Sequence, residues 1–144
     1  AFTNHPRLLG SQAAFVVPSG KILDYNYVVT DEGTTSATHV DLATVDQIDF
    51  TLDDTRDVLI WWNANGYNDT NASGLIDQLE IDGVDDTATA TSYTFTTANF
   101  GATLSILYSV SLASGAHTIK CQHRRLVGGT AHWRNRTLLA IMRA

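Results

Sequence analysis

Residues 115–123, GAHTIKCQH, decide how this chain folds. Side chains of a β-strand alternate between two faces, so His117, Ile119, Cys121 and His123 would share one face. The residues between them are Thr, Lys and Gln, followed by Arg124, and all of these suit contact with water. The alternation therefore predicts a strand that packs one face on a hydrophobic core and exposes the other.

The same stretch contains the only cysteine of the chain, which raises the question of a metal site. His117 and Cys121 are four residues apart, or roughly 13 Å along a strand. Ligands of one zinc ion lie about 2.0–2.3 Å from it, so these two cannot share an ion. Cys121 and His123 could do so only with ligands from other strands, and the sequence indicates none. We expect Cys121 to be a small buried hydrophobe and the histidines to be part of the core wall. A hydrogen-bonded structural histidine is the alternative, and no metal or cofactor is expected.

Similar alternation runs through most of the chain and predicts an all-β fold. The segments with this pattern are 13–18, 21–30, 38–44, 45–52, 56–63, 75–83, 88–97, 102–112, 115–126 and 136–143. Turn residues separate them, and no segment has a convincing helical period. About eight to ten short strands at such spacing are typical of a two-sheet antiparallel sandwich.

Length and composition fit one domain. The chain has 144 residues, of which 44% are hydrophobic and 17% are charged, and one cysteine provides no disulfide framework. No apolar run reaches the length of a membrane span, so no membrane partner is expected. Residues 1–12 alternate with neither period, so we divide the chain into an extended arm (1–12) and a sandwich domain (13–144).

The charge is unevenly distributed along the chain. Residues 1–110 contain all 15 acidic residues and three basic ones, a net charge of −12, whereas residues 111–144 have six basic residues and no acid. The interpretation we favour is that the basic end packs against the acidic remainder, within or between subunits. A nucleic-acid partner is not expected, because the protein is acidic overall.

Two predicted strands are apolar on both faces. In 56–63 (RDVLIWWN) and 136–143 (RTLLAIMR), successive residues are apolar, and a two-layer sandwich covers only one face of each strand. Burial against a neighbouring subunit explains this pattern, although a shifted register or cover by the N-terminal arm would also do so. Leu107 stands alone among Thr and Ser on the outer face of its strand. The candidate subunit-contact residues are Leu59, Trp61, Leu107, Leu138 and Met142.

The C-terminal part of the chain resembles the tumour-necrosis-factor-like jelly rolls of bacteriophage structural proteins. The resemblance rests on a hairpin entry, a Gly-Thr loop and an Arg-x-Leu that opens the last strand. The residues that match are Leu112, Gly115, His117, Thr118, Ile119, Gly129, Thr130, Arg136 and Leu138, and LEIDG at 79–83 fits the middle of such domains. The resemblance covers about 70 residues well, and it implies a trimer in which the last strand packs near the threefold axis.

No catalytic motif is present, so we expect no enzymatic activity. The expected function is that of a phage capsid decoration (cement) protein on the outer surface of the virion. Its partner would be the major capsid protein, and its anchor would be the arm, whose contact residues are Phe2, His5, Arg7, Leu8 and Leu9.

The alternative is a receptor- or glycan-binding tip of a tail fibre. Tyr67 and Trp133 lie in stretches predicted to be polar loops, where aromatic rings can stack on sugars. Residues 63–71 and 82–86 are rich in Asn and Asp and could hold calcium, but these are also ordinary turn residues. A binding module should present such groups together at one end of the domain.

Overall fold

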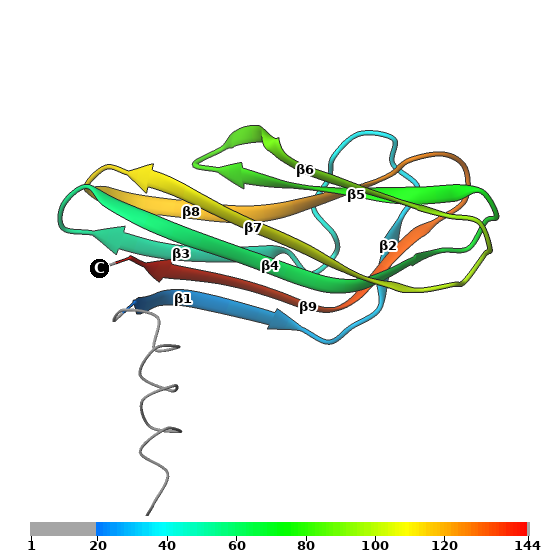
Figure 1. Cartoon of the computed structure of the whole chain (residues 1–144), viewed down its shortest axis with the longest axis horizontal. Helices are drawn as coiled ribbons and strands as arrows, with labels where there is room; N and C mark the ends of the chain where they lie inside the picture. The colour runs from blue at the N-terminus through cyan, green and yellow to red at the C-terminus, as the bar shows by residue number, and fades with distance from the viewer. Residues whose placement is uncertain (1–19, 144) are drawn as a thin grey trace, which may run out of the picture.

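A computed structural model describes residues 20–143, which form two antiparallel β-sheets packed face to face (Figure 1). The strands within these residues are β1 (Lys21–Val28), β2 (Glu32–Thr34), β3 (Asp46–Leu52), β4 (Arg56–Asn68), β5 (Ser73–Ile81), β6 (Val84–Phe95), β7 (Ala102–Leu112), β8 (Gly115–Arg125) and β9 (Ala131–Met142). The all-β prediction is confirmed. The predicted arm (1–12) and the predicted strand at 13–18 lie outside the described residues.

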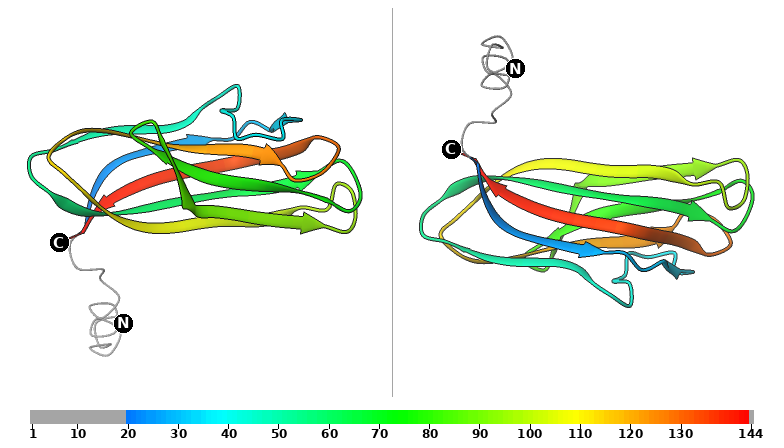
Figure 2. Two further views of the ribbon diagram at one scale, coloured as in Figure 1. Left: turned by 90° about the horizontal axis from the view of Figure 1, so that it is seen from above. Right: turned by 90° about the horizontal axis from the view of Figure 1, so that it is seen from below.

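The strands follow jelly-roll topology. One sheet has the order β1-β9-β4-β7, with the short β2 also pairing with β9; the other has the order β3-β8-β5-β6. We call them the β9 sheet and the β8 sheet. From β2 onward the chain changes sheet at every connection except the β5–β6 turn. Segments far apart in the sequence therefore lie side by side, such as β1 and β9 (Figure 2).

The core lies between the sheets, where the alternating pattern places it. Ile119 and Cys121 of β8 are fully buried, as the opening stretch predicts, and so are Val58, Ile60 and Trp62 of β4. Apolar side chains of both sheets interdigitate there and supply most of the hydrophobic stabilisation. On β7, Leu104 and Ile106 face this core while Leu107 is exposed. The predicted facing of β8 and the predicted outward position of Leu107 on β7 are confirmed.

The predicted strands at 38–44, 56–63 and 136–143 need correction. Residues 38–44 form no strand and make only an isolated bridge between Val40 and His123. β4 continues to Asn68, through part of the predicted loop at 64–74. The inward position of Gly66 lies so close to Leu75 and Leu104 that a side chain would collide with both. The turn-like residues of this segment are thus strand residues selected for close packing.

β9 begins five residues earlier than predicted, because a bulge interrupts its alternation. Asn63 pairs with Thr137, but Asn65 pairs with Arg134, so β9 has an extra residue here. Asn135 adopts a φ of 51°, and the backbone turns enough for Trp133 and Arg136 both to point inward. Trp133 is fully buried in this strand, so placing it in a polar loop was wrong.

Candidate functional site

The outer face of the β9 sheet carries large apolar side chains in register across four strands. Tyr25 pairs with Leu139, Leu139 with Trp61, and Trp61 with Leu107. Paired residues of antiparallel strands point to the same side, so these four side chains form one row across the sheet. A second row lies beside it. We call the two rows the apolar face, which consists of Ile22, Tyr25, Leu59, Trp61, Leu107, Leu139 and Ile141.

No other part of residues 20–143 covers this face. Tyr25 and Leu107, at the two ends of the first row, are 68% and 67% exposed, and Trp61 is 37% exposed. The indole Nε1 of Trp61 donates to Ser105 Oγ at 3.3 Å, which holds the ring against the sheet. Figure 2 (right) views this sheet from outside, with β1 in blue beside β9 in red. An exposed apolar surface of this kind marks an interaction site.

The candidate contact residues are divided between this face and the interior. Leu59, Trp61 and Leu107 lie on the apolar face. Leu138 is 1% exposed and belongs to the core, so its assignment to a subunit contact is corrected. Met142 is on the same inward side of β9, half-buried beside Leu23 at the end of the sandwich.

The apolar residues of β9 that do face outward are Leu139 and Ile141. Both faces of this strand are apolar in the sequence, so its alternation cannot say which set is inside. Ile22 and Tyr25 were missed as well, since β1 reads as a strand with polar neighbours, and a bulge at Leu23 shifts its register. The arm residues Phe2, His5, Arg7, Leu8 and Leu9 lie outside the described residues.

Charged side chains occupy the interior of the sandwich, toward the end opposite Met142. We call Asp46 (β3), Asp77 (β5), His123 (β8) and Arg136 (β9) the buried charge network, and none of them is more than 3% exposed. His123 Nδ1 lies 2.9 Å from Asp77 Oδ1, and its Nε2 lies 3.2 Å from Asp46 Oδ2. Asp46 also accepts from Arg136 Nε at 2.8 Å. The network ties one residue from each of four strands together.

Arg136 is satisfied on every side. Besides Asp46, its guanidinium donates to Glu32 Oε2 at 2.9 Å and to the backbone carbonyls of Thr30, Thr44 and Trp133. A buried arginine is tolerated only with such a set of acceptors. Thr30 and Glu32 precede the irregular 35–45 segment, and Thr44 lies near its end. Arg136 therefore fixes both ends of that segment to the core. The basic C-terminal part of the chain thus pairs with acidic residues within the monomer, as the charge distribution predicts.

The network also shifts the acidities of its members. Burial alone would lower the pKa of His123, but its hydrogen bonds to Asp46 and Asp77 outweigh that and raise it. Burial would raise the pKa of Asp46, but hydrogen bonds from His123 and Arg136 lower it. The pKa of Asp77 is raised, because its complete burial dominates. A charged imidazole between carboxylates is therefore the favoured state.

Asp77, Cys121 and His123 bring three potential metal-ligand atoms within 4.8 Å of one another. The β5 residue Asp77 is the partner from another strand that the sequence did not indicate. Both nitrogens of His123 already face carboxylate oxygens, and burial raises the pKa of the Cys121 thiol well above its usual value. The group therefore fits a hydrogen-bonded ion network better than a metal centre. A hydrogen-bonded structural histidine is the alternative that the sequence offers for His123. The positions of its two ring nitrogens beside carboxylate oxygens agree with that alternative.

The segments considered for calcium use their oxygens internally. Asp69 Oδ1 accepts from the backbone N–H of Thr130 at 2.7 Å. Asp82 accepts from Thr118 N at 2.8 Å and lies 2.8 Å from His117 Nδ1. Neither segment contributes to a group of three clustered metal ligands among residues 20–143.

Comparisons with known proteins bear on the fold alone. No protein-family model and no curated protein sequence matches the chain. Among solved structures, it is similar to Eiger TNF from S. frugiperda (8% identity, TM-score 0.48, 86% of this chain and 94% of that one) and to an infectious bursal disease virus Gx strain structure (10%, 0.46, 88% and 34%). It is also similar to a family 35 carbohydrate binding module from Clostridium thermocellum (12%, 0.39, 89% and 95%).

The TM-scores of these three similarities are below 0.5 and the identities are at most 12%, so none of them transfers a function to this chain. The chain spans only 14–17% of the length of three further, larger chains that it matches. Within residues 20–143, no helix is long and apolar enough to span a membrane.

Proposed function

We propose that this protein is a non-enzymatic structural protein that assembles as a homotrimer through its apolar face and decorates the outer surface of a phage capsid. The apolar face is the observation that carries the proposal. Full burial of an exposed side chain of this size gains roughly 1.5–3 kcal/mol. Tyr25 and Leu107, which are 68% and 67% exposed, leave much of that free energy unused in the monomer. The resemblance to phage jelly rolls supports three copies rather than two, with β9 near the axis.

The remainder of the molecule is consistent with a structural role. The charged side chains inside the sandwich are engaged with one another and stabilise the monomer. The outer face of the β8 sheet is polar, as an outward-facing capsid surface can be, and the arm is the proposed anchor on the major capsid protein. A decoration protein would use these parts to hold neighbouring shell subunits together.

The oligomeric state is the first test. Light scattering coupled to size exclusion should give a trimer at micromolar concentration, and Leu107→Glu should give a folded monomer because it buries an unpaired charge in the contact. Ser92→Glu, at an exposed position of edge strand β6 in the other sheet, is the matched control and should remain a trimer. A wild-type monomer at this concentration would overturn the proposal.

The location on the particle is the second test. Antibody against the chain, applied to virions purified from the source, should label the shell in electron micrographs. Deletion of residues 1–12 should leave a folded trimer that no longer binds shells, since the arm is the proposed anchor. Label confined to the tail tip would instead support the receptor- or glycan-binding alternative, and truncated trimers that bind shells at full occupancy would exclude the arm as the anchor.

A further inference from the structure

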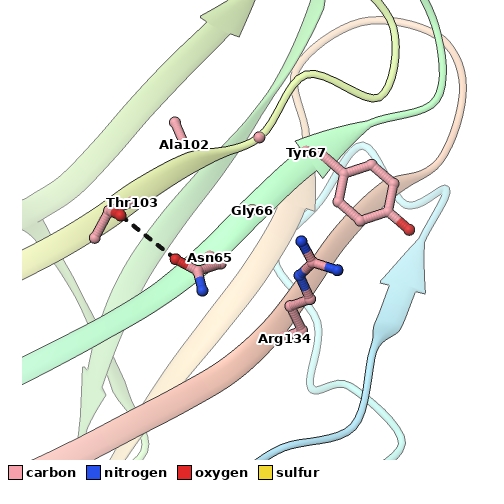
Figure 3. Close-up of a pocket in the computed structure, with 7 residues that line it drawn as sticks. Asn65, Gly66, Tyr67, Ala102, Thr103 and Arg134 are labelled. Carbon is pink, nitrogen blue, oxygen red and sulfur yellow. Dashed lines mark hydrogen bonds between the residues drawn. The ribbon is translucent and has the colours of Figure 1, made fainter.

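A surface pocket of about 400 Å³ lies on the β9 sheet, beyond the end of the apolar face. Its lining comes from three adjacent strands: Asn65, Gly66 and Tyr67 of β4, Ala102 and Thr103 of β7, and Arg134 of β9 (Figure 3). Asn65 is four residues from Trp61 along β4, or roughly 13 Å. We call this cavity the Arg134 pocket.

The β9 bulge brings Arg134 to this pocket. Arg134 pairs directly with Asn65, so the two side chains lie next to each other on the outer side of the sheet. Gly66 and Ala102 alternate with the outward-facing Asn65, Tyr67 and Thr103 and are directed toward the core. Neither therefore places a side chain on the outer surface between the polar groups. Figure 3 shows the guanidinium of Arg134 between Asn65 and Tyr67. The pocket is therefore a shallow polar depression with a cation at its side.

Two donor groups of the pocket, the Arg134 guanidinium and the Asn65 amide, have no partner within residues 20–143. Within residues 20–143, Arg134 forms no salt bridge and no side-chain hydrogen bond, whereas each of the other five basic residues of 111–144 has a partner: Lys120, Arg124, Arg125, Arg136 and Arg143. Thr103 Oγ1 donates to Asn65 Oδ1 at 3.4 Å, which leaves the Asn65 amide N–H groups without a partner among the described residues. A guanidinium and an amide directed to the same space suit an oxyanion.

The neighbouring acid is held away from Arg134. Tyr67 donates its phenol proton to Asp31 Oδ2 at 3.0 Å, and His132 Nδ1 lies 3.2 Å from Asp31 Oδ1. The Tyr67 and His132 rings are stacked, with centroids 4.6 Å apart and planes within 1° of parallel. Tyr67 is thus fixed in place before any ligand arrives, which reduces the entropy lost on binding.

We propose that the Arg134 pocket binds an acidic sugar. The guanidinium of Arg134 holds the sugar carboxylate in a bidentate pair, and Asn65 and Thr103 exchange hydrogen bonds with the ring hydroxyls. The size of the pocket is within the range of small-molecule sites. Its polar lining favours a hydroxylated ligand over an apolar one. This site goes beyond the proposed structural function and does not depend on it.

Saturation-transfer NMR on the full chain tests the proposal, with D-glucuronate and D-glucose observed directly. Inorganic phosphate has no carbon-bound protons, so its binding is measured as competition with glucuronate. Glucuronate should bind with a dissociation constant at least about tenfold lower than glucose or phosphate. Arg134→Gln should weaken glucuronate binding by about tenfold or more, since a hydrogen-bonded ion pair is lost. Thr103→Val should weaken it less, through the loss of one hydroxyl contact.

Arg143→Gln is the matched control. It removes the same charge from an exposed position at the opposite end of the same sheet and should leave binding unchanged. Three results would each overturn the proposal: equal binding of phosphate and glucuronate, equal binding of glucose and glucuronate, or equal losses in the Arg134 and Arg143 variants. Thermal unfolding of each variant shows that it is folded, so that a loss of binding reports on the pocket.

Discussion

One part of the interior and one part of the outer surface of this sandwich differ from what is usual for a soluble domain. Inside, the buried charge network places four ionisable side chains between the sheets. Outside, the apolar face presents a row of Tyr, Leu, Trp and Leu to water. The interior charges are paired with one another, whereas the exterior apolar groups have no cover within residues 20–143. The first region is therefore held together within the monomer, and the second is the surface that we propose other copies of the chain cover.

The outer face of the β8 sheet strengthens this contrast. Its corresponding row across four strands is Gln47, Lys120, Glu80 and Asp85, all polar. Lys120 Nζ lies 3.3 Å from Asp41 and 3.7 Å from Glu80, so its charge is also compensated locally. The two sheets of one sandwich thus differ in their outer faces, and only one of them suits an assembly contact.

The largest expected effect comes from breaking the interior network. Arg136→Met should lower the free energy of unfolding by about 3–5 kcal/mol, because it leaves Asp46 and Glu32 without their shared cation. Arg143→Met, at an exposed position, should change it by no more than about 0.5 kcal/mol. Urea unfolding monitored by tryptophan fluorescence measures both. Similar small changes in the two variants would mean that the network contributes no more than a surface charge.

Neighbouring residues of β9 separate the two regions most sharply. Leu138→Ala should cost about 2–5 kcal/mol of monomer stability, because it opens a cavity in the core. Leu139→Ala should cost much less stability but shift the trimer toward monomers, because its side chain belongs to the apolar face. Chemical unfolding and light scattering on the same two samples test this. If Leu139→Ala destabilises the fold as much as Leu138→Ala and leaves assembly intact, the assignment of the faces is wrong.

A smaller effect should appear in the pH dependence of stability. The pKa of His123 is raised above 6.5, so its stabilising contribution is complete below about pH 6.5 and is lost as the pH rises through its higher folded-state pKa. NMR titration of the imidazole signals should place the His123 midpoint above 6.5 and that of His39, whose pKa burial lowers, below it. His117 also titrates above 6.5, so the signals must be assigned residue by residue. A His123 midpoint below 6.5 would contradict the charged state of the network.

The smallest expected signal is the very slow reaction of Cys121 with thiol reagents. The thiol is fully buried and its pKa is raised, so a thiol reagent should react only as fast as the protein unfolds. The reaction rate with an aromatic disulfide in native buffer, compared with the rate in denaturant, measures this. Rapid labelling of the native protein would show that the interior opens locally near β8.

The sequence was sufficient for the core of most strands, because alternation has a direct physical meaning there. β8 and β7 show this: Ile119, Cys121, Leu104 and Ile106 face inward, and the outward positions between them are polar except for Leu107. It was insufficient on β9, where Leu138 and Leu139 are equally apolar and only the pairing partners decide which is inside. The Arg134–Asn135 bulge adds a one-residue shift that no local pattern in the sequence marks.

The buried charge network could not be predicted for a different reason. The four residues are separated by up to 90 positions in the sequence, and Asp46, Asp77 and Arg136 each look like an ordinary surface residue in their own segment. Only the fold brings them together. His123 was correctly placed on the inward face of β8, but its partners come from strands whose register the sequence does not reveal. Tyr67 likewise looked like a loop residue, because turn-forming residues surround it within β4.

The central position of β9 has a consequence for the synthesis of the chain. β9 pairs with β1, β2 and β4, so it joins three strands that have emerged from the ribosome well before it. β9 lies between β1 and β4 in the finished sheet. Until it is synthesised, the edges of β1 and β4 that pair with it are open. Contacts of such long sequence separation form slowly, and unpaired apolar strands associate with other chains while they wait. Nascent chains that lack β9 are thus the species most in need of a chaperone, and overproduction at low temperature, where synthesis is slow and aggregation is weak, should favour soluble protein.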